Sequence, residues 1–173
     1  NYKKVDVLIN GSGINSSIDF FKITEKNWDE VVKSQITSTF LACQVYGKYM
    51  TSKKNGSIIN ISSASSGPPL SRAFAYSASK SAIKNLTQNL AGEFAKFNVR
   101  VNALRPGFYP TKWNLKNFID SKRKKQILNH TPMNRFGKTE ELIGATLWLA
   151  GDSSSFVTGA EIPVDGGFSA ITI

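Results

Sequence analysis

Residues 56–63 read Gly-Ser-Ile-Ile-Asn-Ile-Ser-Ser, and residues 99–107 read Val-Arg-Val-Asn-Ala-Leu-Arg-Pro-Gly. Both are short apolar runs that end in polar or turn residues, which is typical of β-strands. Between them, apolar residues recur at helical spacing from Phe74 to Phe97, so one long helix is expected there. This order of strand, helix and strand predicts parallel strands joined by a right-handed crossover.

The alternation of strands and helices continues on both sides of this unit. Residues 5–9, Val-Asp-Val-Leu-Ile, predict a strand buried on both faces of a parallel sheet, and residues 26–50 have the periodicity of a helix. Residues 111–129 are polar and basic and predict short helices. A further helix is expected to begin at Thr139, before a last strand at residues 158–164. The expected fold class is therefore α/β, a doubly wound, Rossmann-like parallel sheet.

Size and composition favour a cytoplasmic protein. With 173 residues, the chain is long enough for one domain with its own core, and its apolar stretches are too short to span a membrane. The N-terminus, Asn1 to Lys4, shows no secretory signal. The single cysteine, Cys43, cannot form an internal disulfide and lies in an apolar helical pattern, as expected for a buried residue in a reducing compartment.

The net charge of +10 raises the question of nucleic-acid binding. The basic residues are spread along the chain, however, and no zinc-ligand pattern or aromatic-rich RNA-binding motif accompanies them. The largest cluster, residues 122–125, has the composition of a solvated helix face or loop tip. We therefore expect no nucleic acid, no membrane and no metal among the partners.

Three residues have the chemistry for moving a proton to or from a carbonyl oxygen. Tyr76 and Lys80 lie four residues apart, so a helix places them on one face. A free tyrosine has a pKa of about 10, and an ammonium beside it is expected to lower that pKa. Ser63, at the end of the preceding strand, can donate a hydrogen bond to an oxygen on which negative charge develops.

These motifs, in their order and spacing, resemble those of the short-chain dehydrogenase/reductase family. They are Asn10-Gly11-Ser12-Gly13 after the first strand, Ser63, the Tyr76-x-x-x-Lys80 pair, and the strand and turn of residues 99–107. The resemblance extends from about Val5 to Phe168. It implies an oxidoreductase that transfers a hydride between a carbonyl or alcohol and a nicotinamide cofactor, NAD or NADP.

The resemblance also implies roles for individual residues. Tyr76 is the expected general acid/base, Lys80 lowers its pKa and contacts the nicotinamide ribose, and Ser63 holds the substrate oxygen. Ser62 is the rival for the last role, but the family pattern favours the second serine. The implied cofactor contacts are Asn10, Gly11, Ser12, Gly13, Tyr76, Lys80, Pro106, Gly107, Tyr109 (through its backbone) and Thr111.

One position departs from the family pattern. The family has a fourth catalytic residue, an asparagine, on the helix after the first strand seen here, and the matching residue is Gln35. A glutamine carries the same amide on a longer arm, so it could support a water relay to Lys80 from a displaced position. The alternative, in which Gln35 only tethers a helix backbone, is equally open.

The first part of a dinucleotide-binding sheet has no counterpart in this sequence. Such a sheet begins with a strand, a glycine-rich turn and a helix that binds the pyrophosphate. Neither Gly11-Ser12-Gly13 nor Gly166-Gly167 has that spacing. The resemblance therefore implies that residues 1–173 form a single partial domain, truncated at its N-terminus, with the first three strands absent. Such a chain is expected to bind the cofactor weakly and to be inactive alone. A natural half-domain is the alternative, but it would leave a strand edge at residues 5–9 unpaired.

The C-terminal third narrows the choice of substrate. Residues 130–137 and 156–170, together with Pro69-Leu70-Ser71-Arg72, resemble family members that are mannonate (fructuronate) oxidoreductases or gluconate 5-dehydrogenases. A sugar acid is therefore the expected substrate. Its negative charge would suit Arg105, where the family usually has a small residue, and the basic residues 122–125, although solvent exposure is the simpler explanation of that cluster.

The long helices also predict whether the protein forms oligomers. Their alanine- and phenylalanine-rich faces, at residues 26–50 and 74–97, carry more apolar surface than one sheet face can cover, so a homo-oligomer is expected. Two other function classes stay open, a non-catalytic relative that serves as an interaction or structural module and a basic nucleic-acid-binding module. The intact Ser63, Tyr76 and Lys80 argue against the first, and the dispersed charge argues against the second.

Overall fold

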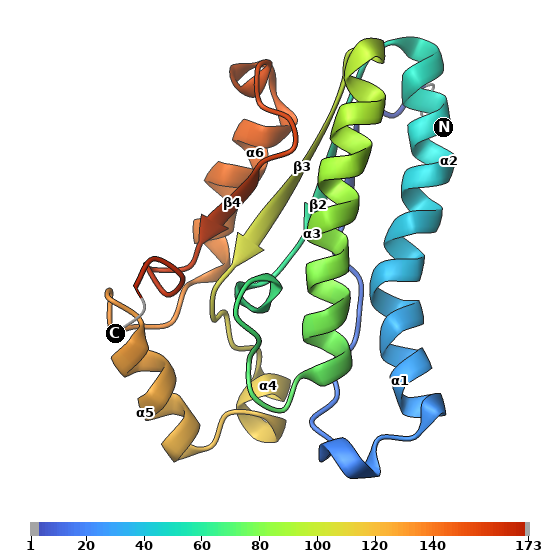
Figure 1. Cartoon of the computed structure of the whole chain (residues 1–173). Coiled ribbons are helices and arrows are strands. Elements are labelled where there is room, and N and C mark those ends of the chain that lie inside the picture. The colour runs from blue at the N-terminus through green and yellow to red at the C-terminus, as the bar shows by residue number, and fades with distance from the viewer. Residues whose placement is uncertain (1–3, 172–173) are drawn as a thin grey trace.

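The computed structural model describes residues 4–171, without the side chains of Lys112, Trp113 and Asn117. Within that range one parallel sheet has the strand order β1-β2-β3-β4. The strands are β1 (Val7–Asn10), β2 (Gly56–Ile61), β3 (Val99–Pro106) and β4 (Glu161–Val164). Because the strands are all parallel, their carboxyl ends lie at one edge of the sheet, which is the lower edge in Figure 1.

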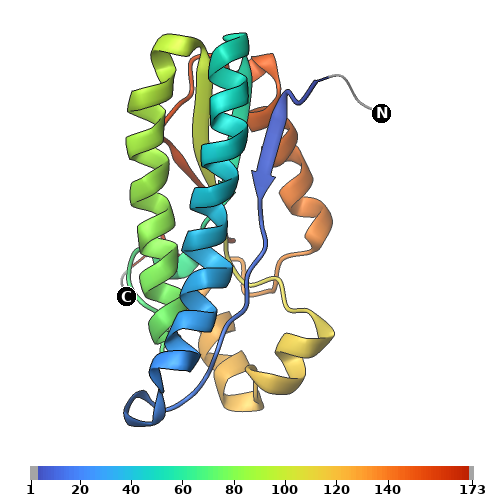
Figure 2. The same ribbon diagram turned by 90° about the vertical axis from the view of Figure 1, so that its right-hand side faces the viewer.

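Helices cover both faces of the sheet. α2 (Ser38–Lys53) and α3 (Phe74–Phe94) lie side by side on one face, and α6 (Ile143–Ala150) lies on the other (Figures 1 and 2). α4 (Lys112–Asn117) and α5 (Ser121–His130) lie beyond the carboxyl ends of the strands. The predicted Rossmann-like α/β fold is therefore confirmed.

Shorter elements complete the described chain. α1 (Glu25–Val32) begins with a capping box, in which the Thr24 side chain accepts from the Asn27 backbone and the Asn27 side chain accepts from the Thr24 backbone. The 3-10 turns span Phe20–Lys22, Ala64–Ser66, Ala95–Phe97, Thr139–Leu142 and Asp152–Ser154. The helix expected to begin at Thr139 therefore starts as a 3-10 turn, and regular α-helix begins at Ile143.

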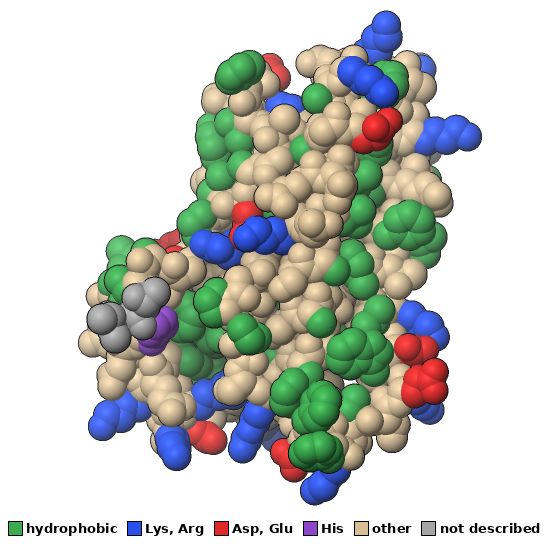
Figure 3. All heavy atoms as spheres, in the orientation of Figure 1, with side chains coloured by type: hydrophobic (Ala, Val, Ile, Leu, Met, Phe, Trp, Pro, Cys, Tyr) green, Lys and Arg blue, Asp and Glu red, His purple; other side chains and the backbone are tan. Residues whose placement is uncertain are grey.

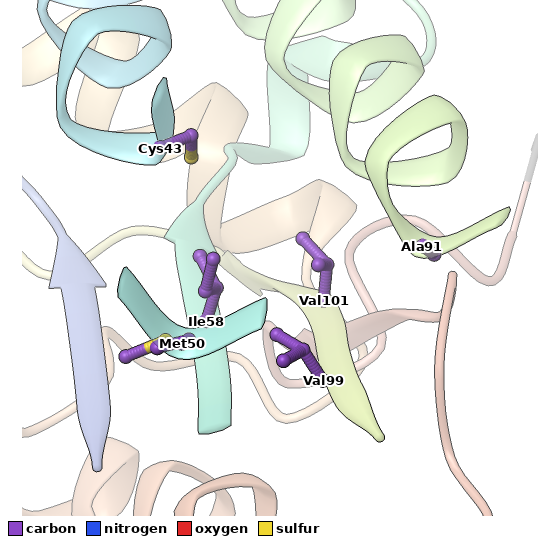
Figure 4. Packing of buried hydrophobic residues seen from close by; sticks show 6 residues of the cluster. All are labelled: Cys43, Met50, Ile58, Ala91, Val99 and Val101. Atoms are coloured by element: carbon purple, nitrogen blue, oxygen red, sulfur yellow. The ribbon is translucent and has the colours of Figure 1, made fainter. Parts of the chain in front are cut away.

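The core has two layers because successive side chains of a strand point to opposite faces of the sheet. Ile58 and Ile59 are neighbours in β2 and both are fully buried, one in each layer. Ile58 packs beneath α2 and α3 in a cluster with Cys43, Met50, Ala91, Val99 and Val101 (Figure 4). Ile59 packs beneath α6 in a cluster with Leu104 and Leu149.

Cys43 is a core residue, as its sequence pattern predicted. Its side chain is buried, and burial raises the pKa of the thiol to about 11. The thiol is therefore protonated at neutral pH and is a poor nucleophile.

The helix predicted over residues 26–50 is interrupted by a π-helical turn at Lys33–Thr37. The carbonyl oxygen of Gln35, inside this turn, accepts hydrogen bonds from the hydroxyls of Ser38 at 3.1 Å and Thr39 at 2.8 Å. Hydrophobic periodicity could not predict this interruption, because apolar residues continue at helical spacing on both sides of it. Such turns within helices often mark functional positions.

Residues 4–171 contain neither a helix that could cross a membrane nor a cluster of metal-ligand side chains. None of the described helices is both long and apolar enough to cross a membrane. In the same range, no three histidine, cysteine or acidic side chains gather as a set of metal ligands.

Candidate active site

The carboxyl edge of the sheet borders a cavity of about 600 Å³. Segments that follow three different strands line it, since Gly13 comes after β1, Ser63 after β2 and Gly107 after β3. Parallel strands bring these distant residues together because their carboxyl ends share one edge. Ligands of open α/β sheets bind at this edge.

Ser63 lies two residues after the end of β2 and caps the 3-10 turn at Ala64–Ser66. Its hydroxyl oxygen accepts hydrogen bonds from the backbone N–H and the hydroxyl of Ser65, each at 3.2 Å. The Ser63 hydroxyl also lies close enough to the Tyr76 phenol to lower its pKa. These contacts hold the serine hydroxyl at the wall of the cavity, beside the phenol.

Tyr76 and Lys80 lie one turn apart near the start of α3, as their spacing predicted. Tyr76 lines the cavity, whereas Lys80 is buried behind it with only 4% of its surface exposed. The ammonium nitrogen of Lys80 lies 5.5 Å from the centroid of the Tyr76 ring and donates to the carbonyl oxygen of Ile61 at 2.6 Å. The lysine therefore joins α3 to the end of β2.

The pKa of Tyr76 does not move in the direction that the sequence predicted. Burial raises this pKa above its ordinary value, and the hydrogen bond with Ser63 opposes the rise. The Lys80 ammonium faces the ring and the Ile61 carbonyl, and burial lowers its own pKa to about 8. In this state of the site, Tyr76 is a neutral phenol, which is the form required to protonate a carbonyl oxygen.

Gln35 is buried in the π-helical turn, with 2% of its surface exposed. Its amide nitrogen donates to the carbonyl oxygen of Ile14 at 2.9 Å, and its amide oxygen has no hydrogen-bond partner among the described residues. Gly13 has φ +152°, and a Cβ added there would lie 2.3 Å from the Gln35 amide. Gln35 thus contacts the loop after β1, whereas the predicted tether was to a helix backbone.

Ser62 takes no part in lining the cavity. Its hydroxyl donates to Glu161 Oε1 at 2.6 Å, and the hydroxyl of Ser66 donates to the same oxygen at 2.6 Å. Glu161 therefore holds the loop on both sides of Ser63. This arrangement favours Ser63 over its neighbour as the hydroxyl that faces a substrate.

Arg105 lies outside the lining of the cavity. Its guanidinium donates to Glu161 Oε2 at 3.1 Å and to the Ser169 hydroxyl at 2.8 Å. Lys84 also lies near this carboxylate, 3.6 Å from Oε2. In this arrangement the guanidinium of Arg105 is already paired with a carboxylate of the protein itself. The predicted contact of Arg105 with an anionic substrate therefore finds no support. Sequence reasoning missed Glu161, which lies more than fifty residues away from Arg105 in the chain.

The predicted cofactor residues divide into two groups. Gly13, Tyr76, Pro106, Gly107, Tyr109 and Thr111 line the cavity. Asn10, Gly11, Ser12 and Lys80 do not, and the Asn10 side chain instead donates to Asn60 Oδ1 at 2.8 Å inside the fold. The Tyr109 hydroxyl donates to the carbonyl oxygen of Val164 at 2.9 Å, so the residue presents other atoms to the cavity, in keeping with its predicted backbone role.

The cavity also contains Asn15 and Asn114, which sequence reasoning did not single out, and Arg123, which belongs to the basic cluster of residues 122–125. Asn15 comes from the loop after β1, Asn114 from α4 and Arg123 from α5. The sequence pattern of Asp120 three residues before Arg123 could have located the start of α5, where Asp120 Oδ1 accepts from the Arg123 backbone at 2.7 Å. It could not have shown that the Arg123 side chain reaches the cavity.

The family model described as enoyl-(acyl carrier protein) reductase matches residues 1–169. The chain belongs to the short-chain dehydrogenase/reductase family. Among curated proteins it is 42% identical over 187 residues to an uncharacterized oxidoreductase of Bacillus subtilis, covering 96% of this chain and 67% of the relative. It is 39% identical over 170 residues to the 2-dehydro-3-deoxy-D-gluconate 5-dehydrogenase of Dickeya dadantii, covering 98% of this chain and 67% of that enzyme.

A solved gluconate 5-dehydrogenase has nearly the same fold. The gluconate 5-dehydrogenase of Burkholderia cenocepacia, in complex with NADP and tartrate, superposes with a TM-score of 0.93 at 28% identity. The match covers 97% of this chain and 66% of the solved one. The predicted resemblance to gluconate 5-dehydrogenases is therefore confirmed. This chain spans about two thirds of the length of the relatives that it matches.

Proposed function

We propose that the protein to which this chain belongs uses NAD or NADP to reduce the ketone of a sugar acid, or to oxidise the corresponding alcohol. The observation that carries the proposal is that Ser63 and Tyr76, two hydroxyls from different elements, line one cavity. Lys80, buried directly behind the phenol, completes the set of residues on which the family resemblance rests.

Ser63 and Tyr76 are arranged to bind one carbonyl oxygen between them. In reduction, the Ser63 hydroxyl donates a hydrogen bond to this oxygen, and the Tyr76 phenol transfers its proton to it as negative charge develops. A bound nicotinamide cofactor supplies the hydride to the carbonyl carbon. In oxidation the same residues act in reverse, and Tyr76 then accepts the proton of the alcohol.

The described residues fit the nicotinamide end of such a cofactor. The turn after β3 lines the cavity with backbone, and Gly107 is packed so closely that a Cβ there would lie 2.7 Å from Asp165 Cα. Lys80 uses one donor for Ile61 and has two others for ribose hydroxyls. The pyrophosphate end finds no cradle in residues 4–171, because a long loop separates Gly13 from the start of α1 at Glu25.

Gln35 is proposed to support proton transfer through a water molecule. Its amide oxygen is buried without a partner among the described residues, and the π-helical turn that carries it packs against α3. A buried acceptor of this kind is normally satisfied by water. Such a water would connect the amide to the Lys80 ammonium, while the amide nitrogen keeps its bond to Ile14.

The substrate class rests on the relatives and on the lining of the cavity. Relatives from several bacteria are named gluconate or 2-dehydro-3-deoxy-D-gluconate 5-dehydrogenases. In this chain Asn15 and Asn114 offer amide groups to the cavity, which suits a ligand with several hydroxyls. The basic side chains are dispersed over the face shown in Figure 3 and form no continuous stripe there, which favours a small-molecule substrate.

The proposal is tested with the protein completed at its N-terminus from its own coding sequence. We expect it to reduce 5-keto-D-gluconate, or to oxidise 2-dehydro-3-deoxy-D-gluconate, with a change in the absorbance of NADH or NADPH. Acetoin serves as the uncharged comparison substrate. Turnover of acetoin without turnover of either sugar acid would overturn the substrate class, and no turnover of any carbonyl or alcohol would overturn the proposed activity.

We also propose that the protein is a homo-oligomer. α2 exposes Phe40, Leu41, Val45 and Tyr46, and α6 with the following turn exposes Ile143, Leu147, Trp148 and Phe156. Exposed apolar surface of this extent is typical of interfaces between subunits.

Light scattering at micromolar concentration is expected to show a dimer or tetramer. Leu147→Asp is expected to shift the protein toward the monomer, whereas the exposed control Lys138→Asp is expected to leave the oligomeric state unchanged. A wild-type monomer contradicts this proposal.

A further inference from the structure

Arg123 differs from every other described residue that lines the active-site cavity. It is the one charged side chain in that lining, since the other contributors are apolar, glycine, or neutral polar residues such as Asn15 and Asn114. The cavity also contains Ser63 and Tyr76. A single positive charge in a cavity of neutral walls attracts an anionic ligand more strongly than the same charge in open water.

Contacts within the fold hold the guanidinium in place without neutralising it. Arg123 Nη1 donates to the Ser71 hydroxyl at 3.3 Å, and Nη2 donates to the Ser71 carbonyl oxygen at 3.0 Å. Both acceptors are uncharged. In the part of the chain that the structure describes, no carboxylate lies within 4.0 Å of the guanidinium, and donors remain on it because an arginine has five N–H groups.

Two other arginines, Arg105 and Arg135, have different surroundings. Arg105 forms an ion pair with Glu161 at 3.1 Å, and Arg135 forms one with Glu141 at 2.7 Å. Lys122, Lys124 and Lys125 flank Arg123 in α5 but are exposed and do not line the cavity. Within the basic cluster of residues 122–125, the fold therefore turns one residue inward and leaves the rest in solvent.

We propose that Arg123 binds the carboxylate of the substrate and sets the preference of the enzyme for acids over neutral carbonyl compounds. This inference rests on the proposed function. In a 5-keto sugar acid the reacting carbonyl and the carboxylate stand at opposite ends of the carbon chain. With the carbonyl at Ser63 and Tyr76, the carboxylate extends across the cavity toward α5, where a guanidinium can bind it through two parallel N–H donors.

The first test measures binding without turnover, in the completed protein. Calorimetry with D-gluconate as the probe is expected to show affinity lowered about ten- to hundredfold in Arg123→Gln, the range for loss of a charge-assisted hydrogen bond. Arg123→Lys, which keeps the charge, is expected to recover part of the affinity. Lys124→Gln removes the same charge from the same helix outside the cavity and is expected to bind as the wild type does. Equal affinity in the wild type and Arg123→Gln overturns the inference.

Two readouts separate this inference from its premise. In Arg123→Gln, the ratio of kcat/KM for 5-keto-D-gluconate to kcat/KM for acetoin is expected to fall, with the larger part of the change in KM. A loss of the same factor for both substrates overturns the inference, since it shows general damage. If the wild type reduces keto sugar acids but the Arg123 variants keep the ratio, the proposed function stands and the role of Arg123 does not.

Discussion

Replacing Tyr76 with phenylalanine is expected to lower kcat of the completed enzyme by about a hundredfold or more, the usual contribution of a positioned general acid. The variant keeps the ring beneath the Lys80 ammonium and removes only the hydroxyl that meets Ser63. KM for the substrate is expected to change much less than kcat, because proton transfer occurs in the transition state. Stopped or continuous assays of NADH or NADPH absorbance measure both constants.

The structure provides a matched control for this substitution. Tyr49 lies in α2, outside both the cavity lining and the surface proposed for oligomerisation, so Tyr49→Phe removes a phenolic hydroxyl without touching the cavity. The control is expected to retain wild-type kcat. Wild-type turnover in Tyr76→Phe would show that another group supplies the proton, and the mechanism proposed above would then be wrong.

The second large effect concerns the cofactor. The 173-residue chain by itself is expected to bind NADH or NADPH several powers of ten more weakly than the completed protein and to show no turnover. Phosphate recognition needs backbone N–H groups at a helix N-terminus that follows a glycine-rich turn directly. In residues 4–171 the glycines after β1 lead into a loop, and α1 begins only at Glu25.

The expected size of this loss follows from the missing phosphate contacts. Each hydrogen bond to a charged group contributes roughly 1.5–3 kcal/mol, so the loss of several such bonds lowers the affinity by several powers of ten. Titration by cofactor fluorescence or calorimetry compares the two forms directly, and circular dichroism shows whether the shorter chain is folded. A micromolar dissociation constant for the 173-residue chain would refute this prediction.

Much of the fold could be predicted from local sequence. The strands beginning at Gly56 and Val99 and the helix beginning at Phe74 lie where apolar periodicity places them. Periodicity succeeds there because each strand is buried against helices, which demands an unbroken apolar run. It fails at Lys33–Thr37, where the π-helical turn depends on the hydrogen bonds of hydroxyls and amides rather than on the apolar pattern.

The arrangement of the proposed catalytic residues was predictable for a different reason. Tyr76 and Lys80 lie one turn apart on a single helix, so their spacing alone places them on one face. Ser63 follows a strand whose position the sequence also indicated. Their pKa values were not predictable, because burial raises that of Tyr76 and lowers that of Lys80, and burial depends on what packs around them.

The sequence by itself therefore determined the parallel α/β fold, the family, and the placement of the residues proposed for proton transfer, since these depend on periodicity and on short spacings along one element. Only the tertiary structure decided which charges are available to a substrate. Arg105 and Arg123 are equally basic in the sequence, yet the fold brings Glu161 against Arg105 and turns Arg123 into the cavity. Those contacts join residues from elements far apart in the chain, and no local sequence pattern indicates which of these residues come into contact.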